Sequence, residues 1–189
     1  MLIVVGGNTR NIGKTTLVCE IVAALPTMNW TAMKITQFGH GRCADDGMAC
    51  ECAPSDPDHV YAIDEQTAPD GTDTGRYLAA GARRSFWIRC REGLLAEAMP
   101  RVRDILASAP NAIVESNSLM QFVRPDLYLT IVDRAGGDFK VSAQRFLTLA
   151  DLAVAPRNRA QAVEFAVQRA AAKVNDTVTR PSGPPWISS

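Results

Sequence analysis

The residues best suited to chemistry lie near the start of the chain, in the segment Gly6-Gly7-Asn8-Thr9-Arg10-Asn11-Ile12-Gly13-Lys14-Thr15-Thr16. Glycines let a backbone turn so that its N–H groups point inward, and a helix that follows brings its positive end to the same anion. A lysine and a hydroxyl at the start of that helix add a cation and a ligand for Mg²⁺. The segment therefore predicts a phosphate-binding loop.

In such a loop Lys14 would reach the β- and γ-phosphates of a nucleoside triphosphate, and the Thr15 hydroxyl would ligate Mg²⁺. The strict pattern G-x4-G-K-[ST] places glycine where this chain has Asn8, and Gly7 lies one residue earlier. The alternative is an ordinary strand-to-helix turn that contains glycine and lysine. We expect the nucleotide to contact the loop and the first helical turn at Gly7, Asn8, Thr9, Arg10, Asn11, Ile12, Gly13, Lys14, Thr15 and Thr16.

The elements on either side of the loop agree with this prediction. Residues 1–5 form an apolar run rich in branched side chains, which is typical of a fully buried parallel strand. Residues 14–25 carry apolar side chains at spacings of three and four, which predicts a helix with one apolar face that ends at Pro26. Strand, glycine-rich loop and helix in this order form the context that phosphate binding requires.

Strands and helices continue to alternate along the chain. We predict further strands at residues 30–35, 85–90, 112–114, 127–132 and 152–154, and helices at residues 72–82, 94–107, 142–150 and 160–174. This alternation predicts an α/β fold of three layers, in which helices cover both faces of a mostly parallel sheet. A chain of 189 residues suits one domain, which we place at residues 1–176 with an insertion at 37–71, followed by a loosely held tail at 177–189.

Several segments together resemble the SIMIBI class of P-loop proteins. The loop has the form G-x5-G-K-T, which is similar to that of dethiobiotin synthetase, the nitrogenase iron protein, the nickel-insertion GTPases of urease and hydrogenase, and the molybdopterin-guanine-dinucleotide adaptor MobB. Ser116-Asn117-Ser118 follows Glu115 where a typical MobB has glycine. The resemblance implies nucleotide binding and a homodimer formed across the nucleotide. Three further segments are similar to MobB: Ala32-Met33-Lys34, Asp73-Thr74-Gly75-Arg76-Tyr77-Leu78-Ala79-Ala80-Gly81-Ala82 and Ile113-Val114-Glu115.

The resemblance also implies roles for residues at strand ends. Glu115 would hold Mg²⁺ directly or through water, and Lys34 would neutralise phosphate. The alternatives are an exposed strand-end carboxylate, a surface lysine and, for Asp73 and Arg76, a local ion pair at i, i+3 spacing. A clean N-K-x-D motif is absent, so ATP and GTP both stay open, and Asn158 is a positional candidate for the base pocket.

A second group of reactive side chains lies in the segment 40–59, which holds both histidines of the chain and three of its five cysteines: His40, Cys43, Cys50, Cys52 and His59. Three thiolates and one imidazole can complete a tetrahedral Zn²⁺ site, and a metal would order a loop that has few large apolar residues. The alternatives are reduced thiols without metal and an iron–sulfur cluster. We expect Cys19 and Cys90, which lie among apolar residues, to be packing residues.

Charge and composition narrow the choice of partner and compartment. Lys and Arg number 20, and Asp and Glu number 20, so the net charge gives no reason to expect nucleic acid or an anionic membrane. The apolar run at the N-terminus is too short for a signal peptide or a membrane span. We therefore predict a cytosolic protein whose cysteines are reduced.

These features lead to one main hypothesis and two alternatives. The main hypothesis is a Mg²⁺-dependent nucleoside triphosphatase that serves assembly of a metal- or molybdopterin-type cofactor, with an enzyme of cofactor biosynthesis or a metalloenzyme as its partner. The alternatives are an ATP-dependent ligase or small-molecule kinase similar to dethiobiotin synthetase, and a nucleotide-controlled adaptor with negligible turnover. For hydrolysis, positioning and charge neutralisation would be the main contributions of the protein, and no general base is identifiable.

Overall fold

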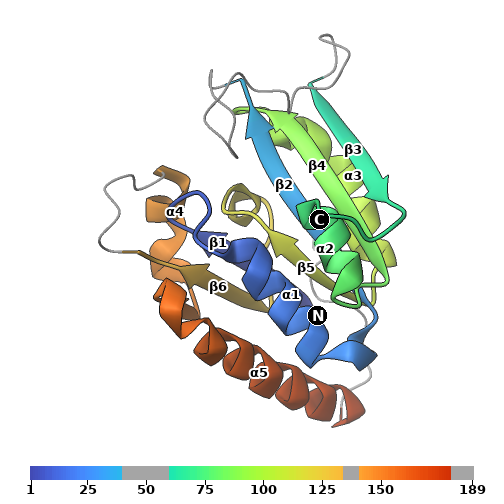
Figure 1. Cartoon of the computed structure of the whole chain (residues 1–189), viewed down its shortest axis with the longest axis vertical. Coiled ribbons are helices and arrows are strands. Elements are labelled where there is room, and N and C mark those ends of the chain that lie inside the picture. Colours follow the sequence, from blue (N-terminus) through green and yellow to red (C-terminus); the bar gives the residue numbers. More distant parts are fainter. Residues whose placement is uncertain (40–59, 134–140, 180–189) are drawn as a thin grey trace.

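In the computed structural model, which describes residues 1–39, 60–133 and 141–179, a seven-stranded sheet lies at the centre of the molecule (Figure 1). The strand order is β3-β4-β2-β5-β1-β6-β7, and every pair is parallel except β3 with β4. The strands are β1 (Leu2–Gly7), β2 (Trp30–Phe38), β3 (Tyr61–Gln66), β4 (Arg84–Arg91), β5 (Asn111–Glu115), β6 (Leu127–Ile131) and β7 (Leu152–Val154).

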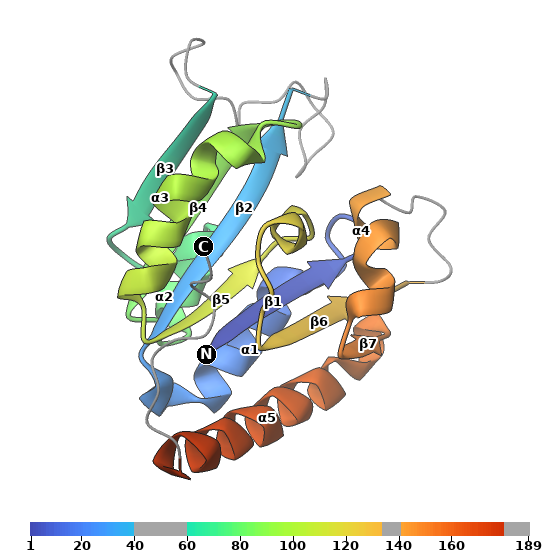
Figure 2. The same ribbon diagram turned by 180° about the vertical axis from the view of Figure 1, so that it is seen from behind.

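Helices cover both faces of this sheet, which confirms the predicted three-layer α/β arrangement. Helices α1 (Lys14–Ala24), α2 (Asp73–Ala79) and α5 (Arg159–Thr179) lie on the face toward the viewer in Figure 1. Helices α3 (Leu95–Ser108) and α4 (Val141–Phe146) lie on the opposite face, seen in Figure 2. Within the described ranges, none of these helices combines the length and the apolar composition that crossing a membrane requires.

The sequence of β1 explains why it occupies the middle of the sheet. Ile3 and Val5 point into a core shared with α1 and α5, whereas Leu2 and Val4 point into a second core shared with α3. All four side chains are at most 3% exposed. A strand that is covered on both faces must be apolar throughout, as this one is.

The register of the central strands brings three strand ends together. Val5 of β1 and Lys34 of β2 both pair with Glu115 at the end of β5. Ligand sites in parallel α/β sheets lie beyond the carboxyl ends of the strands. The loop after β1, Lys34 and Glu115 therefore share one edge of the sheet.

Three predicted boundaries are wrong. Tyr61–Gln66 forms β3, and Gln37 and Phe38 continue β2, although we expected an irregular insertion at 37–71. β3 carries little apolar pattern because it is an edge strand whose acids pair with arginines of β4. The helix predicted at 142–150 ends at Phe146 and continues as a 3-10 turn, Leu147–Leu149. Helix α5 extends to Thr179, past the expected domain end at 176.

Candidate functional site

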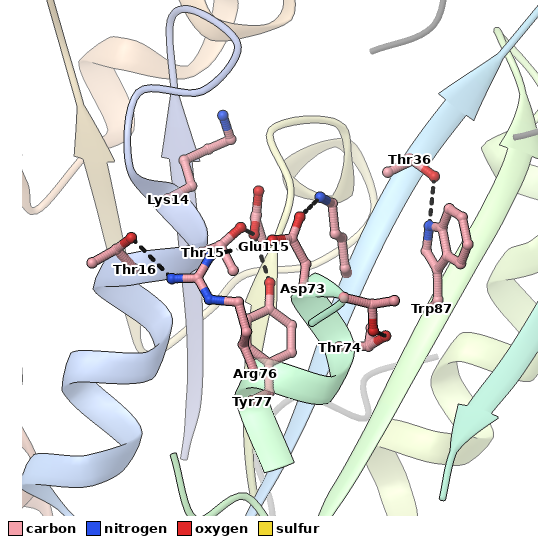
Figure 3. Close-up of polar contacts among 12 residues, drawn as sticks. Lys14, Thr15, Thr16, Thr36, Asp73, Thr74, Arg76, Tyr77, Trp87 and Glu115 are labelled. Carbon is pink, nitrogen blue, oxygen red and sulfur yellow. Dashed lines mark hydrogen bonds and ion pairs between the residues drawn. The ribbon is translucent and has the colours of Figure 1, made fainter. Parts of the chain in front are cut away.

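The centre of the site is the carboxylate of Glu115, which ends β5 and is 6% exposed. Its Oε2 atom accepts a hydrogen bond from the Thr15 hydroxyl at 2.7 Å and another from the Tyr77 hydroxyl at 2.5 Å (Figure 3). Strand β5, helix α1 and helix α2 thus each contribute one side chain. The alternative of an exposed strand-end carboxylate is wrong.

Lys14 begins α1 beside this carboxylate. Its Nζ atom donates a hydrogen bond to the backbone carbonyl of Thr9 at 3.0 Å, across the loop. Burial lowers the pKa of Lys14, while the nearby negative charge of Glu115 opposes that shift. The ammonium group is therefore held inside the loop, with a neutral carbonyl as its hydrogen-bond acceptor.

Helix α1 starts without a side-chain cap. Gly13 precedes it in the left-handed region, with φ 99°, and neither a capping side chain nor an acid occupies the first turn. The first N–H groups of a helix lack partners inside the helix and carry its positive end. The head of α1 therefore offers donors and partial positive charge next to Lys14.

Asn117 is a residue of the site that sequence reasoning missed. Its side-chain amide accepts a hydrogen bond from Gly7 N and donates one to Gly7 O, both at 2.9 Å. A Cβ atom on Gly6 would lie 2.4 Å from Asn117 Oδ1, so only glycine leaves room for this contact. The polar sequence Ser116-Asn117-Ser118 directly after Glu115 was a signal that could have identified this position.

Asn8 connects the loop to the neighbouring strand β6. It is 1% exposed, and its amide exchanges hydrogen bonds with the backbone of Asp133, at 2.8 and 2.9 Å. Its backbone N–H donates to Ile131 O at 3.2 Å. Through these bonds Asn8 anchors the loop to the end of β6, and its nucleotide contact stays a prediction.

Helix α2 attaches to the site through a second set of contacts. Lys34 forms an ion pair with Asp73, and Arg76 reaches the same carboxylate at 3.5 Å. Arg76 also donates to the Thr16 hydroxyl at 3.3 Å. The Lys34 side chain is 13% exposed, so it is not an ordinary surface lysine. The local pair between Asp73 and Arg76 exists, but both residues also bind to neighbouring elements.

The other residues predicted to contact the nucleotide surround Lys14, Thr15 and Glu115. Arg10 and Asn11 are exposed at the tip of the loop, and Ile12 is buried in the core with α1.

Asn158 lies in the 3-10 turn Pro156–Asn158, where its backbone N–H donates to Ala155 O at 2.8 Å. A nearby hollow of about 470 Å³ is lined by Glu20, Arg157, Arg159, Ala160, Val163 and Glu164. Asn158 is not among its lining residues.

The predicted zinc ligands His40, Cys43, Cys50, Cys52 and His59 lie outside the described residues. Within the described ranges, no group of three or more His, Cys, Asp or Glu side chains is arranged to hold a metal.

Cys90 is fully buried, and burial raises the pKa of its thiol to about 11. Cys19 packs against the core from α1. Both cysteines are packing residues, as expected.

The loop, the uncapped helix, Lys14, Thr15 and Glu115 form one continuous polar site at the carboxyl edge of the sheet. Each of these residues was singled out from the sequence, whereas Tyr77 and Asn117 were added by the fold. Comparison of the chain with protein-family models, with curated proteins and with solved structures finds no match in any of the three.

Proposed function

We propose that this protein binds a nucleoside triphosphate, ATP or GTP, together with Mg²⁺ and hydrolyses its terminal phosphate bond. The observation that carries the proposal is the hydrogen bond of 2.7 Å between the Thr15 hydroxyl and Glu115 at the head of α1. In phosphate-binding loops a hydroxyl of this kind and an acid from a neighbouring strand hold Mg²⁺. The half-buried Thr15 and the buried Glu115 fit that ion because they supply oxygen ligands and one negative charge.

The phosphates fit the adjacent part of the site. The uncapped N-terminus of α1 supplies N–H donors, and anions bind favourably at such a helix end. Lys14 donates to the neutral carbonyl of Thr9, and a phosphate oxygen is the stronger acceptor because its bond is charge-assisted. When a triphosphate binds, Lys14 would therefore exchange the carbonyl of Thr9 for a phosphate oxygen, which is the stronger hydrogen-bond acceptor.

Hydrolysis forms a bond from water to the γ-phosphorus and breaks the bond to the oxygen that bridges the β- and γ-phosphates. The products are a nucleoside diphosphate and inorganic phosphate. Lys14 would stabilise the charge that develops on the bridging oxygen, while Thr15 and Glu115 would hold the metal. Mg²⁺, when bound, supplies neutralisation of the β- and γ-phosphate oxygens. We assign no general base.

We further propose a P-loop fold of the SIMIBI class and a role in assembly of a metal- or molybdopterin-type cofactor. Support comes from the resemblance to MobB in the loop and in the segments that end in Lys34 and Glu115. The partner would be an enzyme of cofactor biosynthesis or a metalloenzyme, and two copies of the chain would meet across the nucleotide. We also propose that the cysteines and histidines of segment 40–59 bind Zn²⁺.

The base has room beside α1. The hollow lined by Arg157 and Arg159 adjoins the loop, because Arg159 Cδ lies 3.4 Å from the position of a Cβ on Gly13. We place the ribose and base in this hollow, where guanidinium groups can stack on a purine. This placement replaces Asn158 as the candidate for base contact.

Replacement of Lys14 by alanine tests the proposal. We expect Lys14→Ala to weaken triphosphate binding and to lower turnover about 100-fold or more, since a positioned cation on the phosphates is lost. Titration calorimetry and phosphate release measure the two effects. Arg101→Ala, which removes an exposed cation from α3 on the opposite face, is the matched control and should change neither. Equal affinity in the parent and in Lys14→Ala would refute the phosphate-loop assignment.

The products separate this function from its two alternatives. Inorganic phosphate without a phosphorylated small molecule supports hydrolysis. A phosphorylated or cyclised acid would instead indicate a ligase or kinase, and binding without turnover would indicate an adaptor. Mass spectrometry of a reaction with ATP or GTP distinguishes all three.

A further inference from the structure

We infer that Tyr77 is a positioning residue of the metal site, whose buried hydroxyl orients the Glu115 carboxylate toward the cation. The inference rests on the proposed function, because it assigns Glu115 to Mg²⁺. Tyr77 belongs to α2, which contributes no residue to the phosphate loop. Its role would make a helix outside the loop necessary for metal binding.

The hydrogen bonds to Glu115 are distributed unevenly between its two oxygens. Thr15 and Tyr77 both donate to Oε2, at 2.7 and 2.5 Å, and no described residue donates a hydrogen bond to Oε1. Two donors on one oxygen fix the rotation of the carboxylate. The other oxygen is then left to accept a cation, which is the arrangement that a metal-ligating carboxylate needs.

Tyr77 acts as a donor in this contact. Its side chain is 0% exposed, and burial, followed by the negative charge of Glu115, raises its pKa well above the usual value. A phenol hydroxyl carries a hydrogen and a carboxylate oxygen carries none, so the contact of 2.5 Å is a hydrogen bond that Tyr77 donates. A neutral donor orients Glu115 without cancelling its charge, whereas a lysine or arginine would compete with Mg²⁺.

Helix α2 holds Tyr77 in place through other contacts with the site. Asp73, Arg76 and Tyr77 follow one another at i, i+3 and i+4, so they share one face of the helix. Asp73 pairs with Lys34, and Arg76 donates to Thr16. The aromatic ring of Tyr77 packs in the core with α1. Packing of the ring and the polar contacts of Asp73 and Arg76 therefore both hold Tyr77 in position.

Tyr77→Phe tests the inference, because phenylalanine keeps the ring and removes only the hydroxyl. The measurement is binding of a fluorescent triphosphate analogue as a function of Mg²⁺ concentration, with a parallel titration in EDTA. We expect the Mg²⁺ concentration at half-saturation to rise about 10-fold or more, as for other partners that orient a metal ligand. The affinity in EDTA should not change. Tyr61→Phe is the matched control, since Tyr61 lies in the edge strand β3 and packs against the core on the α3 side of the sheet.

The possible outcomes are distinct. Superimposable Mg²⁺ curves for Tyr77→Phe and a Mg²⁺-dependent parent would overturn the inference and leave the proposed function intact. An equal loss of affinity with Mg²⁺ and in EDTA would also overturn it, because the hydroxyl would then act on the loop and not on the metal. A parent that binds no triphosphate at all would refute the proposed function itself, and the inference with it.

Discussion

The acids of the β3–β4 edge and the carboxylate of Glu115 bind their partners in different ways. At the β3–β4 edge, Glu65 accepts two hydrogen bonds from Arg84, at 2.7 and 2.9 Å, and Asp64 accepts one from Arg89 at 2.5 Å. At the carboxyl edge of the sheet, the hydrogen bonds of Glu115 come from two hydroxyls. The edge acids are paired with guanidinium groups, whereas the hydroxyls that donate to Glu115 are neutral.

The two groups also differ in their access to solvent. The Glu65 side chain is 43% exposed, and Glu115 is 6% exposed. Water screens the first charge strongly, so its ion pair contributes little to stability. The second charge acts in surroundings of lower dielectric constant, where it interacts strongly with a nearby cation. Burial together with hydroxyl partners therefore distinguishes Glu115 from the acids of the β3–β4 edge.

We expect the largest effect on folding stability at Asn117, whose side chain connects the turn after β5 to the backbone of the loop. Asn117→Ala leaves the N–H and C=O groups of buried Gly7 without their partner, which costs about 2 kcal/mol or more of unfolding free energy. Urea unfolding measures this loss, and triphosphate affinity should fall as well. Gln121→Ala, an exposed position in the next turn, is the control. Unchanged stability in Asn117→Ala would mean that the amide does not support the loop.

The smallest effect is expected at the β3–β4 edge. Glu65→Gln should lower the free energy of unfolding by less than about 1 kcal/mol and leave nucleotide binding unchanged, because the pair with Arg84 is exposed. The hydrogen bonds from Arg84 lower the pKa of Glu65 below its usual 4.5. The small contribution is therefore present at neutral pH and lost as the pH falls below that value, which urea unfolding at several pH values checks. A loss of several kcal/mol would contradict the comparison.

The position of the loop beside Glu115 could be predicted from the sequence because local patterns identify both. An apolar run of residues 1–5 predicts a buried strand, and Glu115 follows another short apolar run. Since both strands are parallel and central, their carboxyl ends had to lie at one edge of the sheet. The contact between Thr15 and Glu115 follows from that topology, although 100 residues separate the two.

The residues that orient the site could not be predicted in the same way. Asn117 meets Gly7 across 110 residues, and this contact depends on the turn after β5. Tyr77 lies on a helix that the sequence predicts, but nothing local shows that its hydroxyl reaches Glu115. β3 was missed because cross-strand ion pairs replace the apolar alternation that identifies a strand. These contacts depend on the tertiary structure and not on local propensity.

One measurement tests the central claim most directly: triphosphate affinity as a function of Mg²⁺ for the parent, Glu115→Gln and the control Glu65→Gln. Glutamine keeps the acceptor oxygen for Thr15 and Tyr77 and loses the charge, so Glu115→Gln should fold normally. The account predicts that Mg²⁺ strengthens binding in the parent and in Glu65→Gln and has little effect in Glu115→Gln. Three identical Mg²⁺ curves would contradict it, because Glu115 would then have no part in holding the metal.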